Sequence, residues 1–392
     1  MNPRKKILFL TSRIPFPLEK GDKLRAYYQI KYLSKENDIV LCCISDSEIT
    51  DRAKEELSKY TSAIYVYKTS KLSILSNLFV AWLKGLPFQV GFFFNSGAHF
   101  YFNSIVKKEK PDHIFVQLIR MAEYVSKIKS IPKSLDYMDT FSKGMERRMD
   151  KASGIKKSIF RFEFSRLRKY EERVFNIFDN SYIISKQDQE SFSFPSANQI
   201  KISPNGVDHH FFQPDLYREK FYDIVFTGNM SYPPNVNAVV YLVKEILPLL
   251  KEQLPNIKIL IAGATPNSTV KNLASENVHI SGWLDDIRDA YNDAKIFLAP
   301  LQIGTGLQNK LLEAMSMELP CITSELANNA LGAEPNQEIL IGKLPKDYAN
   351  HVIDLLKSDK LCHLLKVNGK KFVTKTYNWN SITSDLTQDF FS

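Results

Sequence analysis

The sequence lacks an apolar run of the roughly 18 residues that a membrane-spanning helix needs. Its most apolar region, residues 72–94, is interrupted by Lys84, Gly85 and Pro87. The basic N-terminal residues lead into an apolar stretch that is too short for the core of a signal peptide. These absences argue against a membrane span and a secretion signal, so we expect a cytoplasmic protein.

Metal-binding and redox patterns are also missing. The chain has four cysteines, and no Cys-x-x-Cys or Cys/His spacing suggests a zinc site. No Asp-x-Asp pair lies in a loop suited to a divalent cation, so we expect neither a bound metal nor another cofactor. The expected first strand, residues 6–11, is not followed by G-x-G-x-x-G, which argues against a dinucleotide-dependent dehydrogenase.

Positive charge is concentrated in the first half of the chain. Residues 1–192 contain 34 Lys and Arg against 22 Asp and Glu, whereas residues 193–392 contain 18 against 21. A basic first half is expected to face an anionic partner. No recognised nucleic-acid-binding module is present, so nucleic acid is not the expected partner. An anionic membrane surface or a lipid-linked pyrophosphate acceptor explains the excess better.

Two other segments bear on a membrane. Residues 72–94 suit either an interfacial helix that receives a lipid or packing in the core, and we favour the core. Residues 151–174 form a basic helical pattern, for which the alternatives are membrane contact and an ordinary solvated face.

Short apolar stretches that resemble buried parallel strands alternate with helical patterns. In the first half such strands are expected at residues 6–11, 38–44, 64–67, 113–117 and 134–138. The alternation begins again at residues 223–227, after the turn signal Pro204-Asn205-Gly206-Val207-Asp208. This pattern predicts two doubly wound α/β domains, whose ligands bind at the carboxyl ends of the strands.

The most informative stretch is residues 298–324, LAPLQIGTGLQNKLLEAMSMELPCITS. A strand ends there, a glycine turn follows, and a helical pattern begins. Thr305 and Gln308 fit a capping box, so the helix is expected to start beside Gly306 and Leu307 with free backbone N–H groups. Such a helix start attracts anions.

Lys310 adds a positive charge near this helix start, and Glu313 lies three residues further along the same face. A phosphate at the helix start and a ribose at the carboxylate would together hold a nucleotide. A capped surface helix with a Lys310–Glu313 pair is the alternative interpretation.

The run from Gly304 to Met315, followed by Pro320, resembles the donor-site signature of family 4 glycosyltransferases of the GT-B fold. It is most similar to the branch of bacterial exopolysaccharide and PEP-CTERM-associated sugar transferases. Glu313 matches the second of two motif glutamates, which holds the ribose of the donor. Thr305 stands at the position of the first, so the contact to the donor sugar departs from the family's pattern.

The resemblance implies two Rossmann-like domains that face each other across a cleft. Residues 1–205 would bind the acceptor, and a C-terminal helix at residues 380–392 would pack back on them. Residues 206–379 would bind the nucleotide-sugar donor.

Within the expected donor domain, Gly228 and Asn229 lie where the wider family has a basic pair that grips the donor diphosphate. That pair is absent, so Lys310 and the helix start would carry the phosphates. Gly282 and Trp283 lie where the family contacts the nucleotide base, with a buried core position as the alternative for Trp283.

Three positions in the first half are further candidates. Gly21 and Asp22 resemble the family's glycine-bearing acceptor loop, although an ordinary turn is an alternative. Asp139 follows the expected strand at residues 134–138, where the family places a polar residue near the reacting carbon of the donor sugar. A cap on the next helix is the alternative role for Asp139.

The resemblance therefore implies a retaining, metal-independent transferase of the hexosyl type. It would move a sugar from a nucleotide-sugar to a lipid-linked or saccharide acceptor in bacterial surface polysaccharide synthesis. Asp139, Lys310 and Glu313 are the candidate catalytic residues, and the expected location is the cytoplasm, with peripheral attachment to the inner face of the plasma membrane. A nucleotide-sugar 2-epimerase of the same fold and a non-catalytic glycan-binding or nucleotide-sugar-binding assembly protein remain alternatives.

Overall fold

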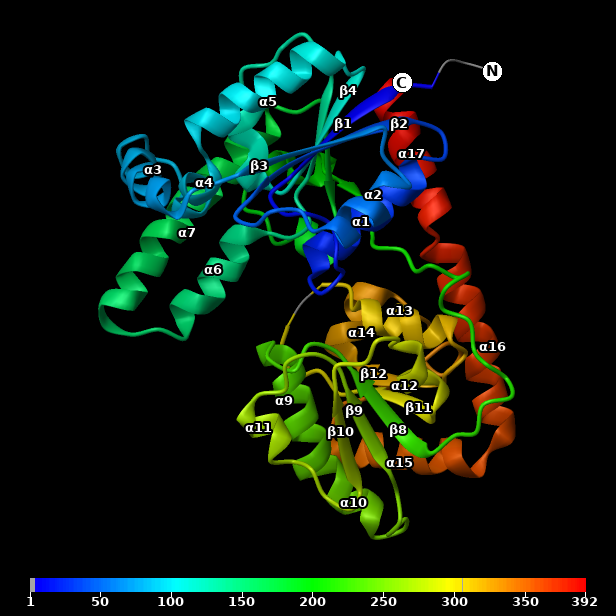
Figure 1. Ribbon diagram of the computed structural model, residues 1–392. Helices are drawn as coiled ribbons and strands as arrows, with labels where there is room; N and C mark the ends of the chain where they lie inside the picture. The colour runs from blue at the N-terminus through cyan, green and yellow to red at the C-terminus, as the bar shows by residue number, and fades with distance from the viewer. Residues whose placement is uncertain (1–3, 305) are drawn as a thin grey trace. The chain divides into compact units, whose positions relative to one another are not determined.

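The computed structural model describes residues 4–304 and 306–392, which divide into two compact units. Unit 1 consists of Met1–Pro204 and Trp379–Ser392, and unit 2 of Asn205–Asn378. Each unit is a parallel β-sheet with helices packed against it (Figure 1). The predicted doubly wound α/β organisation is therefore confirmed for both units.

The sheet of unit 1 has the strand order β3-β2-β1-β4-β5-β6-β7. Its strands are β1 Lys6–Thr11, β2 Asp38–Ser45, β3 Ala63–Lys68, β4 His113–Gln117, β5 Lys133–Asp136, β6 Asn180–Ile183 and β7 Lys201–Ile202. Its helices are α1 Gly21–Leu33, α2 Asp51–Ser58, α3 Lys71–Leu83, α4 Phe88–Phe93, α5 Ser96–Glu109, η1 Ile119–Tyr124, α6 Phe141–Asp150, α7 Gly154–Phe175, α8 Lys186–Gln189, η2 Pro195–Gln199 and α17 Trp379–Phe391.

Both faces of this sheet are buried. Leu8 and Leu10 of β1 point into one apolar cluster, whereas Ile7 and Phe9 point into another on the opposite face. Successive side chains of a strand alternate between faces, so a strand that is apolar throughout needs cover on both sides. This is why the continuous apolar stretches in the sequence predicted β1 and β4 with their observed bounds.

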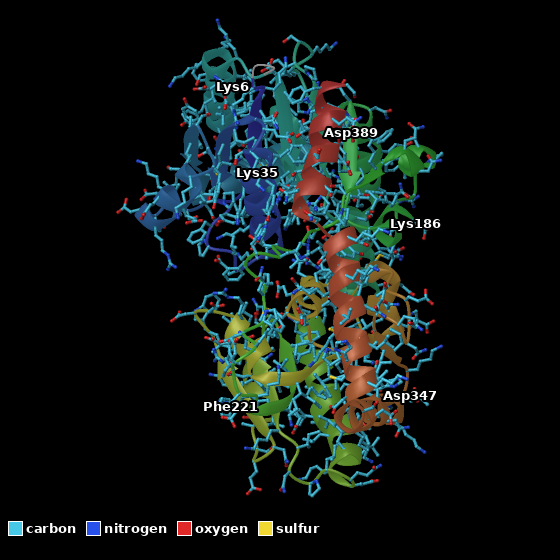
Figure 2. All side chains as sticks on the ribbon, turned by 90° about the vertical axis from the view of Figure 1, so that its right-hand side faces the viewer. Lys6, Lys35, Lys186, Phe221, Asp347 and Asp389 are labelled. Atoms are coloured by element: carbon cyan, nitrogen blue, oxygen red, sulfur yellow. The ribbon has the colours of Figure 1, made fainter. Side chains whose placement is uncertain are left out.

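Helix α17 covers part of unit 1, although it lies at the end of the chain. Trp379 is fully buried and stacks on Tyr28 of α1, with ring centroids 5.6 Å apart. Lys35 donates a hydrogen bond to Asn380 at the start of the helix, and Asp389 lies in its last turn (Figure 2). Helix α17 thus supplies part of the apolar cluster that contains Ile7 and Phe9 of β1.

His113 of β4 is a titratable residue that packs against α17. Its ring is fully buried, stacks on Phe390 of α17 at 4.3 Å and lies 3.0 Å from the Ser134 hydroxyl. Burial lowers the pKa of His113 from 6.5 to about 4, while Asp179 opposes this shift. The native state therefore holds this imidazole neutral.

Acidification is expected to destabilise unit 1 through His113. Between pH 6.5 and about 4 the unfolded chain binds a proton at His113, whereas the native state does not. The free energy of unfolding therefore falls as the pH falls, by about 3 kcal/mol at most. Urea unfolding at pH 7 and at pH 4.5 measures the loss. His113→Gln should show a smaller loss over the same interval, and an equal loss in both proteins would contradict the assignment.

The sheet of unit 2 has the strand order β10-β9-β8-β11-β12-β13. Its strands are β8 Tyr222–Thr227, β9 Ile259–Ala262, β10 Val278–Gly282, β11 Ala294–Ala299, β12 Cys321–Ser324 and β13 Leu340–Gly342. Its helices are α9 Pro233–Tyr241, η3 Leu242–Ile246, α10 Leu247–Lys251, α11 Ser268–Lys271, α12 Arg288–Asn292, α13 Asn309–Ser316, α14 Glu325–Leu331, α15 Pro345–Lys357 and α16 Asp359–Thr376.

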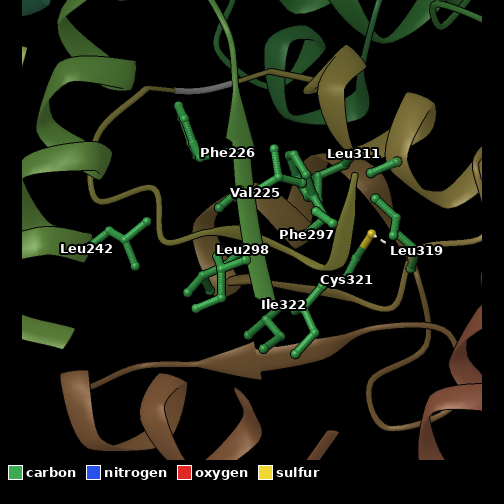
Figure 3. Packing of buried hydrophobic residues seen from close by; sticks show 14 of the residues in the cluster. Val225, Phe226, Leu242, Phe297, Leu298, Leu311, Leu319, Cys321 and Ile322 are labelled. Atoms are coloured by element: carbon green, nitrogen blue, oxygen red, sulfur yellow. Dashed lines mark hydrogen bonds between the residues drawn. The ribbon is translucent and has the colours of Figure 1, made fainter. Parts of the chain in front are cut away.

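The core of unit 2 fixes the helix that carries the predicted donor motif. Val225 of β8, Phe297 of β11 and Leu311 of α13 are fully buried in one apolar cluster (Figure 3). Lys310, the neighbour of Leu311, lies close to the sheet, with its ammonium 4.6 Å from the centre of the Phe226 ring of β8. The core thus positions the motif residues.

Some sequence expectations need correction. The strand expected at residues 134–138 ends at Asp136, since Met138 has a φ of 63° that a strand does not permit.

The prediction that residues 72–94 pack in the core is wrong for the end of α3, because Phe79, Trp82 and Leu83 are 61%, 49% and 63% exposed. Over the described residues, no helix is both long and apolar enough to cross a bilayer.

Candidate active site

Most of the predicted donor residues of unit 2 follow the two strands between which its strand order reverses, whereas Gly282 and Trp283 lie at the end of the edge strand β10. β8 and β11 are neighbours in the sheet, and the strands that follow them in sequence lie on opposite sides of this pair. Loops that leave the carboxyl ends of such a pair diverge and leave room for a ligand. Gly228 follows β8, and the loop between β11 and α13 contains Gly304 and Gly306.

Two glycines allow the strand ends to approach closely. Gly228 and Gly263 have φ values of 151° and 137°, and a Cβ on Gly263 would lie 1.9 Å from the Gly228 carbonyl oxygen. The Gly263 N–H donates to the Gly282 carbonyl at 2.9 Å. The structure thus places the ends of β8, β9 and β10 together, with predicted residues Gly228 and Gly282 on either side of Gly263.

Lys310 reaches from α13 to the loop after β8. Its ammonium donates a hydrogen bond to Asn235 and lies 4.6 Å from the centre of the Phe226 ring. A Cβ on Gly228 would lie 3.1 Å from the Lys310 Nζ. The loop after β8 therefore has a cation beside it, supplied from another element.

The environment of Lys310 favours the neutral form of its amine. Loss of hydration lowers the pKa of Lys310 to about 7, and Glu313 opposes this shift. Among the described residues, no carboxylate forms an ion pair with this ammonium. An anionic ligand would supply the missing counter-charge, so the site favours an anion.

Asn229 holds the loop rather than replacing a cation. Its side-chain oxygen accepts hydrogen bonds from the Ser231 N–H and the Thr265 hydroxyl, each at 2.9 Å. Its carbonyl accepts from the Asn235 amide, also at 2.9 Å. Asn235 in turn bonds Lys310, so these contacts link the loop conformation to the position of the ammonium.

Glu313 is oriented by a buried tyrosine. The Tyr291 hydroxyl donates to Glu313 Oε2 at 2.7 Å and lies 2.8 Å from the Thr227 hydroxyl. Loss of hydration raises the pKa of Glu313, while Tyr291 and Lys310 oppose the rise. One carboxylate oxygen is thus committed to Tyr291, and Oε1 has no hydrogen bond within the described part of the chain.

The start of α13 differs from the expected one. The helix begins at Asn309 with Gln308 as its N-cap, and the Gln308 side chain donates to the Gly306 carbonyl at 3.1 Å instead of closing a capping box. Gly306 has a φ of 87°, which a helix start there would not permit. Gly306 and Leu307 therefore belong to the preceding loop, and Lys310 is the second residue of the helix. Thr305 lies outside the described residues.

Trp283 is not a core residue. It is 62% exposed, and its indole N–H donates to Asp285 at 3.2 Å. The alternative of a buried tryptophan is therefore wrong, and the ring is open to solvent directly after Gly282. Stacking on a nucleotide base stays a prediction.

Asp139 lies in unit 1 between β5 and α6. The N-cap of α6 is Thr140, so the alternative role of Asp139 as a helix cap is wrong. Loss of hydration raises the pKa of Asp139 to about 6, the Asp188 carboxylate adds to the rise, and Arg120 opposes it. Asp139 is also open to solvent on one side.

Gly21 and Asp22 form the first turn of α1 rather than a free loop. The Asp22 carboxylate accepts hydrogen bonds from Arg13 and, at 3.2 Å, from Arg120. These residues follow the carboxyl ends of β1 and β4, where the strand order of unit 1 reverses. Two guanidinium groups therefore share the Asp22 carboxylate. Arg120 Nε is buried and has no hydrogen-bond partner among the described residues.

Several residues of these clusters were not singled out in the sequence. Arg13, Arg120, Asn235 and Tyr291 lie in no recognisable motif, because their contacts join residues that are 9 to 98 positions apart in the sequence. Gly263 could have been found from the sequence, because it is a glycine directly after the apolar strand Ile259–Ala262.

Comparisons with known proteins identify a matching family model, a relative and similar folds. Residues 222–358 match the family model described as "Glycosyl transferases group 1". An "Uncharacterized 44.6 kDa protein in cps region" from Klebsiella pneumoniae is 21% identical to the chain, over 97% of this chain and 98% of that protein.

Two solved structures are similar over nearly their whole length. Anabaena Alr3699/HepE, solved in complex with UDP and glucose, has a TM-score of 0.69 at 12% identity, covering 99% of this chain and 100% of that chain. S. aureus TarM has a TM-score of 0.70 at 12% identity, covering 99% of each chain. These likenesses confirm the predicted GT-B fold.

Proposed function

We propose that the protein is a glycosyltransferase that moves a hexosyl group from a nucleotide-sugar to a lipid-linked or saccharide acceptor, with retention. The observation that carries this proposal is the presence on α13 of both a partly dehydrated ammonium, Lys310, and a carboxylate, Glu313, that Tyr291 orients. The match of residues 222–358 to glycosyl transferases supports the assignment. The cps-region relative supports a role in bacterial surface polysaccharide synthesis.

Each donor residue has a role in this proposal. Glu313 accepts hydrogen bonds from the ribose hydroxyls through its free oxygen. Lys310 and the N–H groups at the start of α13 hold the diphosphate, with Gly306 and Leu307 lining its approach. Gly228 leaves room for the phosphates, and the exposed Trp283 beside Gly282 flanks the base.

The chemical step replaces one bond at the anomeric carbon by another. The acceptor hydroxyl oxygen bonds to that carbon on the face from which the diphosphate departs, and the bond from the carbon to the diphosphate oxygen breaks. The hydroxyl proton passes to the leaving diphosphate. Lys310 stabilises the negative charge that grows there, which we propose it does without a metal ion, and Asp139 contacts the donor sugar near the reacting carbon.

Unit 1 supplies the acceptor side in this proposal. Arg13 and Arg120 both contact the carboxylate of Asp22, and Arg120 also interacts electrostatically with Asp139. Two guanidinium groups in one place suit an acceptor that bears phosphate. A lipid-linked pyrophosphate has this chemistry. We accordingly propose that the protein works in the cytoplasm, attached peripherally to the inner face of the plasma membrane.

A donor screen tests the proposal. Purified protein is incubated with UDP-, GDP-, ADP- and CMP-sugars, each with and without a lipid-linked acceptor extract, and release of free nucleotide is followed. Acceptor-dependent release from one donor supports the transferase. Interconversion of the sugar without an acceptor would indicate a 2-epimerase instead, and binding without turnover would indicate an assembly protein.

Tyr291→Phe is expected to weaken donor binding through Glu313. The variant keeps the buried ring but frees the carboxylate, so KM for the donor should rise by about tenfold while kcat changes less. In the wild type, a donor analogue lacking the ribose 2′-hydroxyl should have a higher KM than the full donor. In Tyr291→Phe the two KM values should differ less, because the contact between that hydroxyl and Glu313 is already weakened. Tyr348→Phe, at another buried tyrosine of unit 2, is the matched control and should leave KM unchanged.

A further inference from the structure

Unit 1 exposes large apolar side chains on two helices that are far apart in sequence. Phe79, Trp82 and Leu83 of α3 are 61%, 49% and 63% exposed. Ile155 and Ile159 of α7 are 81% and 51% exposed. With Phe162, which is 38% exposed, these six side chains are called the apolar face below.

Hydrogen bonds join the two helices into one surface. Arg166 of α7 donates to the carbonyls of Trp82 and Leu86 at 3.0 and 2.9 Å. Glu163 of α7 accepts from the N–H groups of Phe88 and Gln89, at the start of α4, at 2.8 and 3.0 Å. α3, α4 and α7 accordingly lie on the same side of unit 1 (Figure 1).

Aromatic contacts continue the surface between the helices. The rings of Phe88 and Phe162 lie 5.7 Å apart, and Phe79 stacks on Trp82 at 6.2 Å. On α7, Ile155, Ile159 and Phe162 follow the spacing that places side chains on one helical face. The exposed apolar side chains therefore lie on two helices that Arg166 and the start of α4 hold together.

Basic residues outnumber acidic ones in the segments that carry the apolar face. Residues 151–170 contain seven Lys and Arg and one acidic residue, Glu163, which is buried against α4. Residues 77–94 contain one basic residue, Lys84, and no acidic residue. The exposed basic residues nearest the apolar face in sequence are Lys84, Lys151, Lys156, Lys157 and Arg161.

We infer that the apolar face inserts into the interfacial region of a membrane that carries anionic lipids. Aromatic and aliphatic side chains would enter between the headgroups while the lysines and arginines meet lipid phosphates. A second copy of the chain fits less well, because a symmetric contact would bring the two basic rims together. This inference names the docking surface for the peripheral attachment in the proposed function, and its test requires neither donor nor acceptor.

Vesicle binding tests the inference with the full-length protein. Phosphatidylcholine vesicles are compared with vesicles in which about a third of the lipid is phosphatidylglycerol, and binding to the anionic vesicles should be at least about tenfold tighter. The paired change Trp82→Ser and Leu83→Ser should lower that binding by about tenfold or more. Lys156→Glu with Lys157→Glu should lower it similarly and remove most of its salt dependence.

Matched variants in unit 2 provide the controls. Leu216 and Tyr217 are 79% and 99% exposed, so their change to serine removes similar apolar surface elsewhere. Lys251→Glu with Lys271→Glu gives the same change of net charge. Both pairs should bind vesicles as the wild type does, and equal losses in the control and test pairs would overturn the inference.

Depth of insertion gives a second readout. Lipids brominated on their acyl chains should quench tryptophan fluorescence in the wild type, and Trp82→Phe should abolish most of the quenching. Unchanged quenching in that variant would refute insertion at this face. So would a concentration-dependent dimer that the Trp82→Ser and Leu83→Ser pair dissolves while vesicle binding is absent in the wild type.

Discussion

Glu313→Ala and Lys310→Ala are each expected to lower kcat/KM for the nucleotide-sugar by about 100-fold or more. Glu313→Ala removes the acceptor of the ribose hydrogen bonds and leaves the Tyr291 hydroxyl without its partner. Lys310→Ala removes the ammonium that lies beside Gly228, where the diphosphate is proposed to bind. Both side chains are only partly buried, so the fold should persist, which circular dichroism measures.

Lys310 should also make donor binding depend on pH. Its pKa is lowered to about 7, so the ammonium is charged below that pH and loses its proton above it. Donor affinity is therefore expected to fall as the pH rises from 7 towards 9. In Lys310→Arg the guanidinium stays charged over this range, so the fall should be absent.

A matched pair in the same unit controls for loss of charge alone. Glu318 and Lys370 form an ion pair at 2.6 Å away from the candidate site, and neither Glu318→Ala nor Lys370→Ala should alter kcat/KM. Wild-type rates in both Lys310→Ala and Glu313→Ala would refute the proposed donor site. Loss of activity in the control variants as well would show that the assay reports stability instead.

The elements that the sequence predicted best are buried parallel strands. Lys6–Thr11 and His113–Gln117 are covered on both faces, so each is a continuous apolar run whose ends are visible in the sequence. The start of α13 was predicted wrongly, because Thr305 and Gln308 have capping-box spacing although Gly306 adopts a positive φ. Glycine conformation in a loop follows from its tertiary surroundings, which spacing does not record.

The candidate site was predictable only as far as one local motif. Lys310 and Glu313 stand three residues apart and share a helix, so the sequence identified both. Their partners Asn235 and Tyr291 lie 75 and 22 positions away and meet them through the sheet topology. Polar contacts over such separations have no periodicity to detect, so the orientation of the carboxylate and the position of the ammonium came from the structure.

Arg25→Met is expected to destabilise unit 1 by about 3–5 kcal/mol, because it leaves a fully buried carboxylate without its counter-charge. Arg25 of α1 donates to Asp136 at the end of β5 at 2.5 Å, and both side chains are completely buried. Gln29 donates to the same carboxylate oxygen at 2.9 Å. Urea unfolding of the variant measures the loss, and wild-type stability would contradict the assigned role.

The same arginine fixes the end of unit 1. Its guanidinium donates to the carbonyls of Ser203 and Pro204 at 2.8 and 3.1 Å, directly before unit 2 begins at Asn205. Arg25→Met with Asp136→Leu removes both charges and should recover part of the stability lost in either single variant, but not these carbonyl contacts. Faster proteolysis after residue 202 in the double variant than in the wild type, at matched stability, would show that Arg25 anchors this segment separately from its ion pair.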